Sequence, residues 1–271
     1  MLRNVTKLEG HELQGPDGTV GHVRDFFFDE HRWFVRYLVV DTGTWLNRRE
    51  VLISPIALIP GDWTGKLLRI TLSKEQVRRS PSVDTQQVVS RQQEAELSQY
   101  YNWPAYWGAP GFVEGGFGLP MVPQSLAQGV GAETGTDPAA TLSSLKLEET
   151  RRVALQQPPR DSHLRSMRKV KGHRVEATDG SIGEVTDFIV DDATWEIHYL
   201  VIDTGHFWPG KKVLIAPRWI NDVSWNDSKV YADLTREGVK ASPAYDAASP
   251  LDPDYGARLH EHYGRPFTWL P

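Results

Sequence analysis

Two copies of the triplet Asp-Thr-Gly are the most chemically suggestive feature of this sequence. They stand at Asp41-Thr42-Gly43 and Asp203-Thr204-Gly205, each directly after an apolar segment. Aspartic-type hydrolases bring two such carboxylates together so that they share a proton. The same triplet also suits a turn that closes a strand, because Asp bonds its own backbone and Gly accepts a positive φ. The turn is the favoured interpretation, and hydrolysis through Asp41 and Asp203 is the alternative.

The histidines do not form a recognisable ligand set. His11 and His173 each stand alone beside a glycine, and His260 and His262 fall on different sides of a predicted helix. Structural and catalytic metal sites need three or four ligands close together. The sequence therefore predicts neither a metal nor another cofactor.

Four aspartates recur in the two halves of the chain. Asp25 corresponds to Asp187, and Asp29 corresponds to Asp191. A paired acid site is conceivable. Exposed positions on a strand face or in a turn are the commoner setting for aspartate, and we expect them here.

The loops after the two triplets are the strongest candidates for partner binding. Each combines large apolar side chains with two cations: Trp45, Leu46, Arg48 and Arg49 in the first loop, and Phe207, Trp208, Lys211 and Lys212 in the second. Aromatic and Arg side chains are enriched at protein interfaces, and such cations could also hold an anion. The alternative is that the aromatic rings cover the domain core and the cations are solvated.

Both triplets belong to a long internal repeat. Adding 162 to a position in the first half gives its counterpart in the second without a gap. The match runs from Gly10-His11 through Tyr37-Leu38-Val39 and Val51-Leu52-Ile53 to Ser80-Pro81 and Trp107. The repeated unit is therefore roughly a hundred residues long.

Short strands separated by turn signals must position these residues. In the second copy we expect strands at 170–176, 182–190, 195–203, 212–216 and 229–234, with Asp179-Gly180 as a hairpin turn. This spacing favours a small closed barrel or sandwich. Helices are predicted at 73–79 and 235–241, capped by Ser73 and Thr235, and then at 85–101 and, shortened by prolines, at 254–263.

An aromatic tail follows the helices of each copy. Tyr101, Pro104 and Trp107 have counterparts in the second copy, whereas Trp103 and Tyr106 do not. We expect the shared residues to dock each tail on its own barrel. The two extra rings are expected to bury a neighbouring surface.

The composition excludes several classes of protein. The first 109 residues carry 13 basic and 13 acidic side chains, so the rest of the chain supplies the whole net charge of -5. Neither half favours nonspecific nucleic-acid binding. The absence of cysteine removes disulfides and thiolate chemistry. Without a signal-peptide pattern or a long apolar run, a cytoplasmic location is expected.

The repeated residues resemble the PRC-barrel family, which occurs in the H subunit of photosynthetic reaction centres and in a ribosome-maturation factor. The resemblance rests on Gly-His, Asp-Gly, Gly-x-Val-x-Asp-Phe, the strand ending in Asp-Thr-Gly, and Val-Leu-Ile-x-Pro, over about 5–80 and 167–242. The trailing segments resemble those of stand-alone bacterial members with two barrels. The resemblance implies a mainly β fold of two small PRC-type β-barrels, each followed by short helices and an aromatic tail.

The predicted organisation has five parts. They are a first barrel at 1–84, its helix and tail at 85–107, a Gly/Pro-rich linker at 108–162, a second barrel at 163–246, and a short helix and tail at 247–271.

Fold and repeat together predict a non-enzymatic scaffold that binds a protein partner or itself. The barrels are expected to pack in pseudo-twofold fashion, or to form a homodimer through the same surface. The alternatives are a small-ligand or ion sensor linked to photosynthetic or electron-transport complexes, and the aspartic-type hydrolase.

Overall fold

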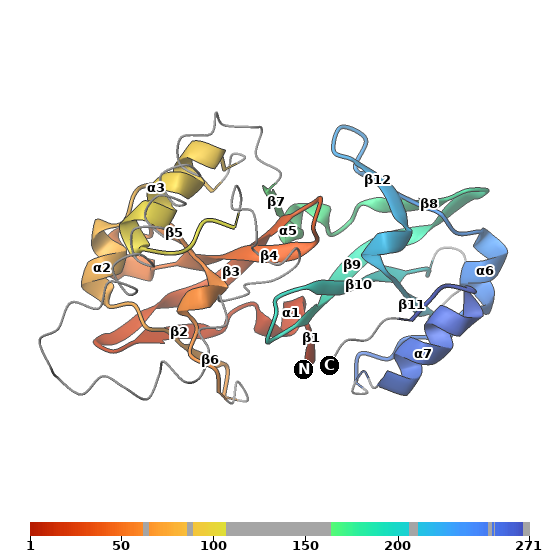
Figure 1. Cartoon of the computed structure of the whole chain (residues 1–271), viewed down its shortest axis with the longest axis horizontal. Coiled ribbons are helices and arrows are strands. Elements are labelled where there is room, and N and C mark those ends of the chain that lie inside the picture. Colours follow the sequence, from red (N-terminus) through yellow and green to blue (C-terminus); the bar gives the residue numbers. More distant parts are fainter. Residues whose placement is uncertain are drawn as a thin grey trace, which may run out of the picture.

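The computed structural model describes residues 1–61, 65–85, 89–106, 164–205, 211–248, 251 and 253–267. Two curled sheets lie side by side, each with helices at its outer end (Figure 1). The mainly β fold class is thus confirmed. The predicted linker at 108–162 and the ends of both aromatic tails, including Trp107, lie outside the described residues.

The first half of the chain and the second contain the same strands and helices in the same order, except that the second has one additional strand, β12. The first half holds β1 (Leu2–Asn4), α1 (Val5–Leu8), β2 (Glu12–Gly15), β3 (Gly18–Asp29), β4 (Phe34–Asp41), β5 (Glu50–Ile53), β6 (Leu67–Arg69), α2 (Lys74–Arg79) and α3 (Arg91–Tyr101). The second holds β7 (Leu164–Ser166), α5 (Met167–Val170), β8 (Arg174–Ala177), β9 (Gly180–Asp191), β10 (Ile197–Asp203), β11 (Lys212–Ile215), β12 (Ile220–Ser224), β13 (Lys229–Ala232), α6 (Arg236–Ala241) and α7 (Pro253–His262).

The two sheets share one topology. Their strand orders are β5-β4-β3-β2-β6 and β11-β10-β9-β8-β13-β12, and β2–β6 and β8–β13 are the parallel pairs. In the first sheet a single bridge between Leu58 and Ile70 stands where β12 pairs with β13 in the second. Hydrogen bonding among the described strands leaves both paths open at their ends rather than closing them into rings. We call the β2–β6 sheet with α2 and α3 the first module, and the β8–β13 sheet with α6 and α7 the second module.

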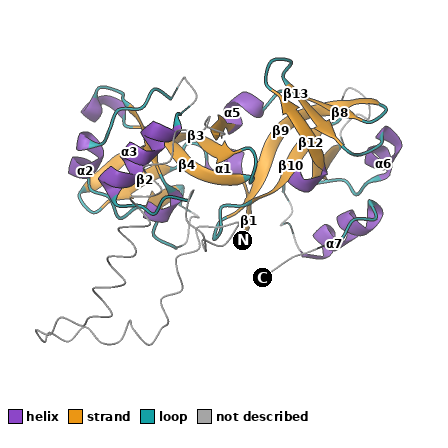
Figure 2. Cartoon of the chain, turned by 45° about the horizontal axis from the view of Figure 1, so that its top comes forward, coloured by secondary structure: helices purple, strands orange, loops and turns teal. Residues whose placement is uncertain are grey.

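The modules exchange their leading strands. β1 pairs with β9 of the second module, and β7 pairs with β3 of the first. The short helix that follows each strand also lies against the other module, α1 beside β9 and α5 beside β3 (Figure 2). Each sheet therefore contains a strand from the half of the sequence that builds the other.

Equivalent residues meet where the modules touch. Phe34 bridges Glu196, which is its counterpart 162 positions later. On either side of this bridge the Val35 amide donates to the Trp195 carbonyl at 2.9 Å, and the Ile197 amide donates to the Trp33 carbonyl at 2.7 Å. These contacts define a pseudo-twofold axis. Glu9 and its counterpart Lys171 also form an ion pair.

One hydrophobic core runs through both modules. Aromatic rings fill its middle. The ring centroids of Phe26 and Trp195 are 6.1 Å apart, and those of Phe28 and Phe188 are 5.8 Å apart. Burying these rings removes a large apolar area from water. The modules are therefore joined by core packing as well as by strand pairing.

Local signals predicted most elements, with four corrections. Val170 ends the short helix α5 and does not begin a strand, since Ser166 caps that helix by accepting a bond from the Lys169 amide. The strand β12 lies in a segment expected to be a connection. Helix α3 begins only at Arg91, after Ser90 forms a capping box. Helix α7 is nearly as long as α3, because Pro253 is its first residue, where a missing amide hydrogen costs nothing.

The described helices are all too short or too polar to cross a membrane.

Candidate functional site

Asp25 and Asp187 fasten the exchanged segments to the modules that receive them. The Asp187 carboxylate accepts bonds from the Asn4 side-chain amide at 2.8 Å and the Thr6 backbone amide at 3.0 Å, and a third from the Thr6 hydroxyl. Asp25 likewise accepts from the Ser166 hydroxyl and from the Arg168 amide. Both carboxylates are buried, and burial raises the pKa of Asp25. The expectation of exposed positions is wrong for Asp25 and Asp187, because two short helices begin over these carboxylates. Asp29 and Asp191 stand at the start of turns, as expected, although Asp29 is also buried, and each accepts bonds from the amides two and three residues further on.

The Asp-Thr-Gly triplets are turns. In each, the aspartate Oδ1 accepts a bond from the glycine amide two residues on, at 2.8 Å for both Asp41 and Asp203. The threonine hydroxyl then bonds across the loop, from Thr42 to the Arg49 carbonyl and from Thr204 to the Lys211 carbonyl. This is the strand-closing role that the turn interpretation predicts.

Asp41 and Asp203 lie at opposite ends of the molecule. They end β4 and β10, which start from the antiparallel bridge at the pseudo-twofold axis and run in opposite directions. At about 3.3 Å per residue the two carboxylates are on the order of 40 Å apart. They cannot share a proton, so the geometry of an aspartic-type hydrolase is not formed.

Arg49 and Lys211, which are equivalent residues, hold the C-terminal ends of α2 and α6. Arg49 donates to the carbonyls of Ser80 and Pro81, both at 2.7 Å. Lys211 donates to the Ser242 carbonyl at 2.7 Å and also to that of Lys240. A cation at this position satisfies terminal carbonyls and complements the helix dipole. These two predicted binding residues thus have a structural role.

The other predicted loop residues fall into three groups. Trp45 and Leu46 are half-buried against the core, and the Trp45 indole donates to the Val20 carbonyl at 2.8 Å. Arg48 and Lys212 are exposed. Phe207 and Trp208 lie outside the described residues. In the first loop, therefore, the Trp45 ring covers the core, and Arg48 is the exposed one of the four predicted binding residues.

The tail of the first module packs on that module. Tyr101 and Trp103 stack with centroids 4.2 Å apart. The Arg36 guanidinium lies over the Tyr106 ring, 3.9 Å from the ring centre, so the surface that Tyr106 covers belongs to the first module itself. In the second module the ring centroids of Tyr263 and the buried Trp219 are 4.9 Å apart.

Beneath this tail is a buried polar cluster centred on Glu94. The Glu94 carboxylate is fully buried, pairs with Arg91 at 2.8 Å and accepts a bond from the Tyr106 hydroxyl at 2.5 Å. Burial raises the pKa of Glu94 to about 7, aided by the nearby Asp29 and opposed by Arg91, Tyr106 and Arg36. The counterpart in the second module is Gly256, so this cluster belongs to the first module alone.

The pKa of Glu94 predicts that stability falls between pH 4.5 and about pH 7. In that range the folded protein holds a proton that the unfolded chain releases, so the free energy of unfolding decreases as the pH rises, by up to about 3 kcal/mol. Above that range both states are ionised, and this dependence ends.

Glu94→Gln keeps an acceptor for Tyr106 and should flatten the dependence of stability on pH, as measured by urea unfolding from pH 4.5 to 8. Glu96→Gln, an exposed position on the same helix, should leave the slope unchanged. An unchanged slope in Glu94→Gln would contradict the assignment.

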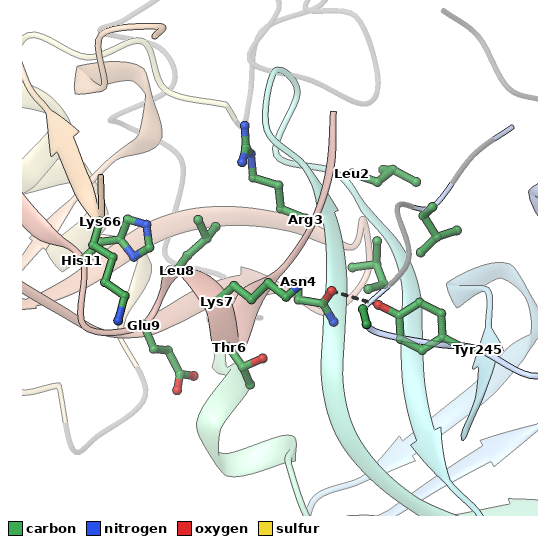
Figure 3. A pocket seen from close by; sticks show the side chains of 13 residues that line it. Leu2, Arg3, Asn4, Thr6, Lys7, Leu8, Glu9, His11, Lys66 and Tyr245 are labelled. Carbon is green, nitrogen blue, oxygen red and sulfur yellow. Dashed lines mark hydrogen bonds between the residues drawn. The ribbon is translucent and has the colours of Figure 1, made fainter. Parts of the chain in front are cut away.

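A pocket of about 600 Å³ opens where the modules meet (Figure 3). Residues of β1 and α1 form one side, and Ile189 of β9, Tyr245 and Leu251 form the other. The Tyr245 hydroxyl donates to the Asn4 side-chain oxygen at 2.8 Å across it. Arg3, Lys7 and Lys66 bring positive charge to its rim, and Glu9 brings one negative charge.

Together these features define a mainly β protein whose two similarly built modules meet about a pseudo-twofold axis. Residues 165–239 match the PRC-barrel domain family. The matched segment runs from β7 to α6, so it contains the exchanged strand of the second module as well as its sheet. A comparison of the chain with curated proteins finds no match.

Sequence reasoning did not find three of these features: the Asp25 and Asp187 caps, the Glu94 cluster and the pocket. The recurrence of Asp25 as Asp187, 162 positions later, was the available signal for the caps. The Glu94 cluster and the pocket occur where the copies differ, so the repeat itself gave no indication of them. Among the described residues, His, Asp and Glu form no group of three that could hold a metal ion.

Proposed function

We propose that this chain is a non-enzymatic scaffold that uses two PRC-type barrels to hold protein-binding loops at a fixed separation. The observation that carries the proposal is the reciprocal exchange of β1 and β7. It joins the modules through paired backbone and a common core. A flexible tether would leave the separation of the modules variable, whereas this joint fixes it.

The assignment of two PRC-type modules is supported by the first module, because its residues repeat those of the segment 165–239 that matches the family. Gly21 and Gly183 approach the same strand-end carbonyls, those of Asp41 and Asp203. Asp25 and Asp187 cap the exchanged helices in the same way. We therefore assign the first module to the PRC type as well, and attribute the pair to duplication.

The loops after the two triplets are the proposed contact surfaces. They follow Asp41 and Asp203, which lie at opposite ends of the molecule, and an exposed cation stands in or next to each, Arg48 in the first module and Lys212 in the second. The counterpart of Arg48 is Gly210, and the counterpart of Lys212 is Glu50, so neither cation is repeated in the other module. A scaffold of this form would engage two partner surfaces, or two copies of one surface.

Cross-linking and co-purification from the source cells would test this function. A partner should be recovered with the wild-type chain, with cross-links near the loops, and should rebind when both proteins are purified. Arg48→Glu combined with Lys212→Glu should weaken that rebinding at least tenfold, because charge reversal in an interface opposes association.

The control reverses two exposed arginines on strands, Arg24→Glu with Arg174→Glu. It makes the same change in net charge, one residue in each module. Equal loss of binding in both double variants would indicate a general charge effect. A chain that recovers no partner under these conditions would contradict the scaffold proposal.

A further inference from the structure

The pocket between the modules is a place where the pseudo-twofold symmetry fails. In the first module Phe27, Val83, Val89 and Leu164 are buried together in one apolar cluster. Their counterparts 162 positions away are Ile189, Tyr245, Leu251 and Leu2, and these four line the pocket. The same framework is therefore filled with side chains on one side of the molecule and hollow on the other.

The hollow side has an apolar wall. Leu2, Leu8, Ile189 and Leu251 all face it. Leu2 and Leu251 are only half-buried, whereas the equivalent Leu164 and Val89 are buried. Leu2 and Leu251 thus expose apolar surface to solvent, and an apolar ligand in the pocket would cover that surface.

The rim carries net positive charge. Arg3 is paired with Asp192, and Glu9 is paired with Lys171. Lys7 donates to the Ala247 carbonyl at 2.8 Å, which is neutral, and in the described part of the chain no carboxylate pairs with Lys7 or Lys66. The Tyr245–Asn4 hydrogen bond adds neutral polar groups beside the apolar wall. Two lysines therefore have charge available for an anion above an apolar cavity.

We propose that this pocket binds a medium-chain carboxylate, with the carboxylate at Lys7 and Lys66 and the hydrocarbon chain against Leu2, Leu8, Ile189 and Leu251. The pocket has the size of ordinary small-molecule sites. Lysines act as single point charges, whereas sites for dianionic phosphate favour the arginine fork. The nearby Glu9 carboxylate also disfavours a second negative charge. This site is separate from the proposed loop surfaces and goes beyond the scaffold function.

Calorimetric titration of the full chain with three probes would test the assignment. Decanoate has both chain and charge, 1-decanol has the chain without the charge, and acetate has the charge without the chain. Decanoate should bind saturably to one site, at least tenfold more tightly than 1-decanol, and acetate should give no binding in the same concentration range.

Two variants locate the site. Lys7→Ala with Lys66→Ala should weaken decanoate at least tenfold and leave 1-decanol within twofold. Lys169→Ala, the counterpart of Lys7 on the filled side, should leave decanoate binding unchanged. Ile189→Phe introduces the residue that fills the equivalent space in the first module, and should abolish binding of both chain-bearing probes.

The lysine variants decide the question even if Ile189→Phe does not fold, because Lys7 and Lys66 are surface side chains. Equal affinity of the wild type for decanoate and 1-decanol would overturn the proposal. So would unchanged decanoate affinity in the lysine double variant, or wild-type binding by folded Ile189→Phe protein.

Discussion

Replacing Asp187 by alanine is expected to lower the free energy of unfolding by about 3–5 kcal/mol. The change removes the acceptor for three hydrogen bonds from Asn4 and Thr6 and leaves their donors unsatisfied in a part-buried seam. Urea denaturation would measure the loss. Hydrogen exchange should show faster exchange at α1, because the cap that holds this helix on the second module is gone.

The matched control is Asp179→Ala. Asp179 also accepts a bond from a helix amide, that of Arg236 at 2.8 Å, but it is exposed. Its removal should cost about 1 kcal/mol, the ordinary value for a surface cap. Asp25→Ala should behave like Asp187→Ala. If Asp187→Ala cost no more than Asp179→Ala, the buried carboxylates would not be what fastens the modules.

Gly183→Ala is expected to destabilise the chain by roughly 3–5 kcal/mol or to prevent folding. A Cβ at this position would lie 2.2 Å from the Asp203 carbonyl oxygen, and the φ angle of 150° is one that side-chain-bearing residues rarely adopt. The obstructing atom is backbone, in the strand paired with β9, so relief requires the strands to separate. Thermal unfolding would report the change.

Gly65→Ala provides the comparison. Apart from Gly65 and its chain neighbours, no atom of the described residues lies within 4 Å of a Cβ built at Gly65, and its φ is not in the left-handed range. This variant should stay within about 0.5 kcal/mol of wild type. Gly21→Ala should resemble Gly183→Ala, because its Cβ would meet the Asp41 carbonyl oxygen at the same 2.2 Å. If Gly183→Ala were as stable as wild type, the prediction would be contradicted, because β9 and β10 would then make room for the Cβ without a loss of stability.

The elements that sequence alone predicted are those with local causes. Ser73 and Thr235 begin α2 and α6 as expected, since each cap lies three residues from the amide that it accepts. The Asp-Thr-Gly turns follow from bonds between residues two apart. Mainly β structure follows from closely spaced turn signals between apolar runs.

The exchanged strands could not be predicted in this way. β1 has three residues and no hydrophobic period, and its partner Asp191 is 189 positions from Leu2. The buried aspartates were misread for a related reason. A carboxylate on a strand usually faces water, whereas Asp187 is covered by a segment from the other half of the chain, which supplies donors from Asn4 and Thr6.

The reciprocal exchange has a consequence for how the chain acquires its fold during synthesis. Leu2 must wait for Asp191 to be translated, roughly 10–40 s at ordinary rates of elongation. Until then the end of β3 that will receive β7 is an open edge, available to the leading strand of another nascent chain. Association of two first modules about the same axis would bring Glu9 against a second Glu9, with like charges facing each other. Only the later arrival of Lys171 converts that contact into attraction, so the ion pair favours completion within one chain over exchange between neighbours on a polysome.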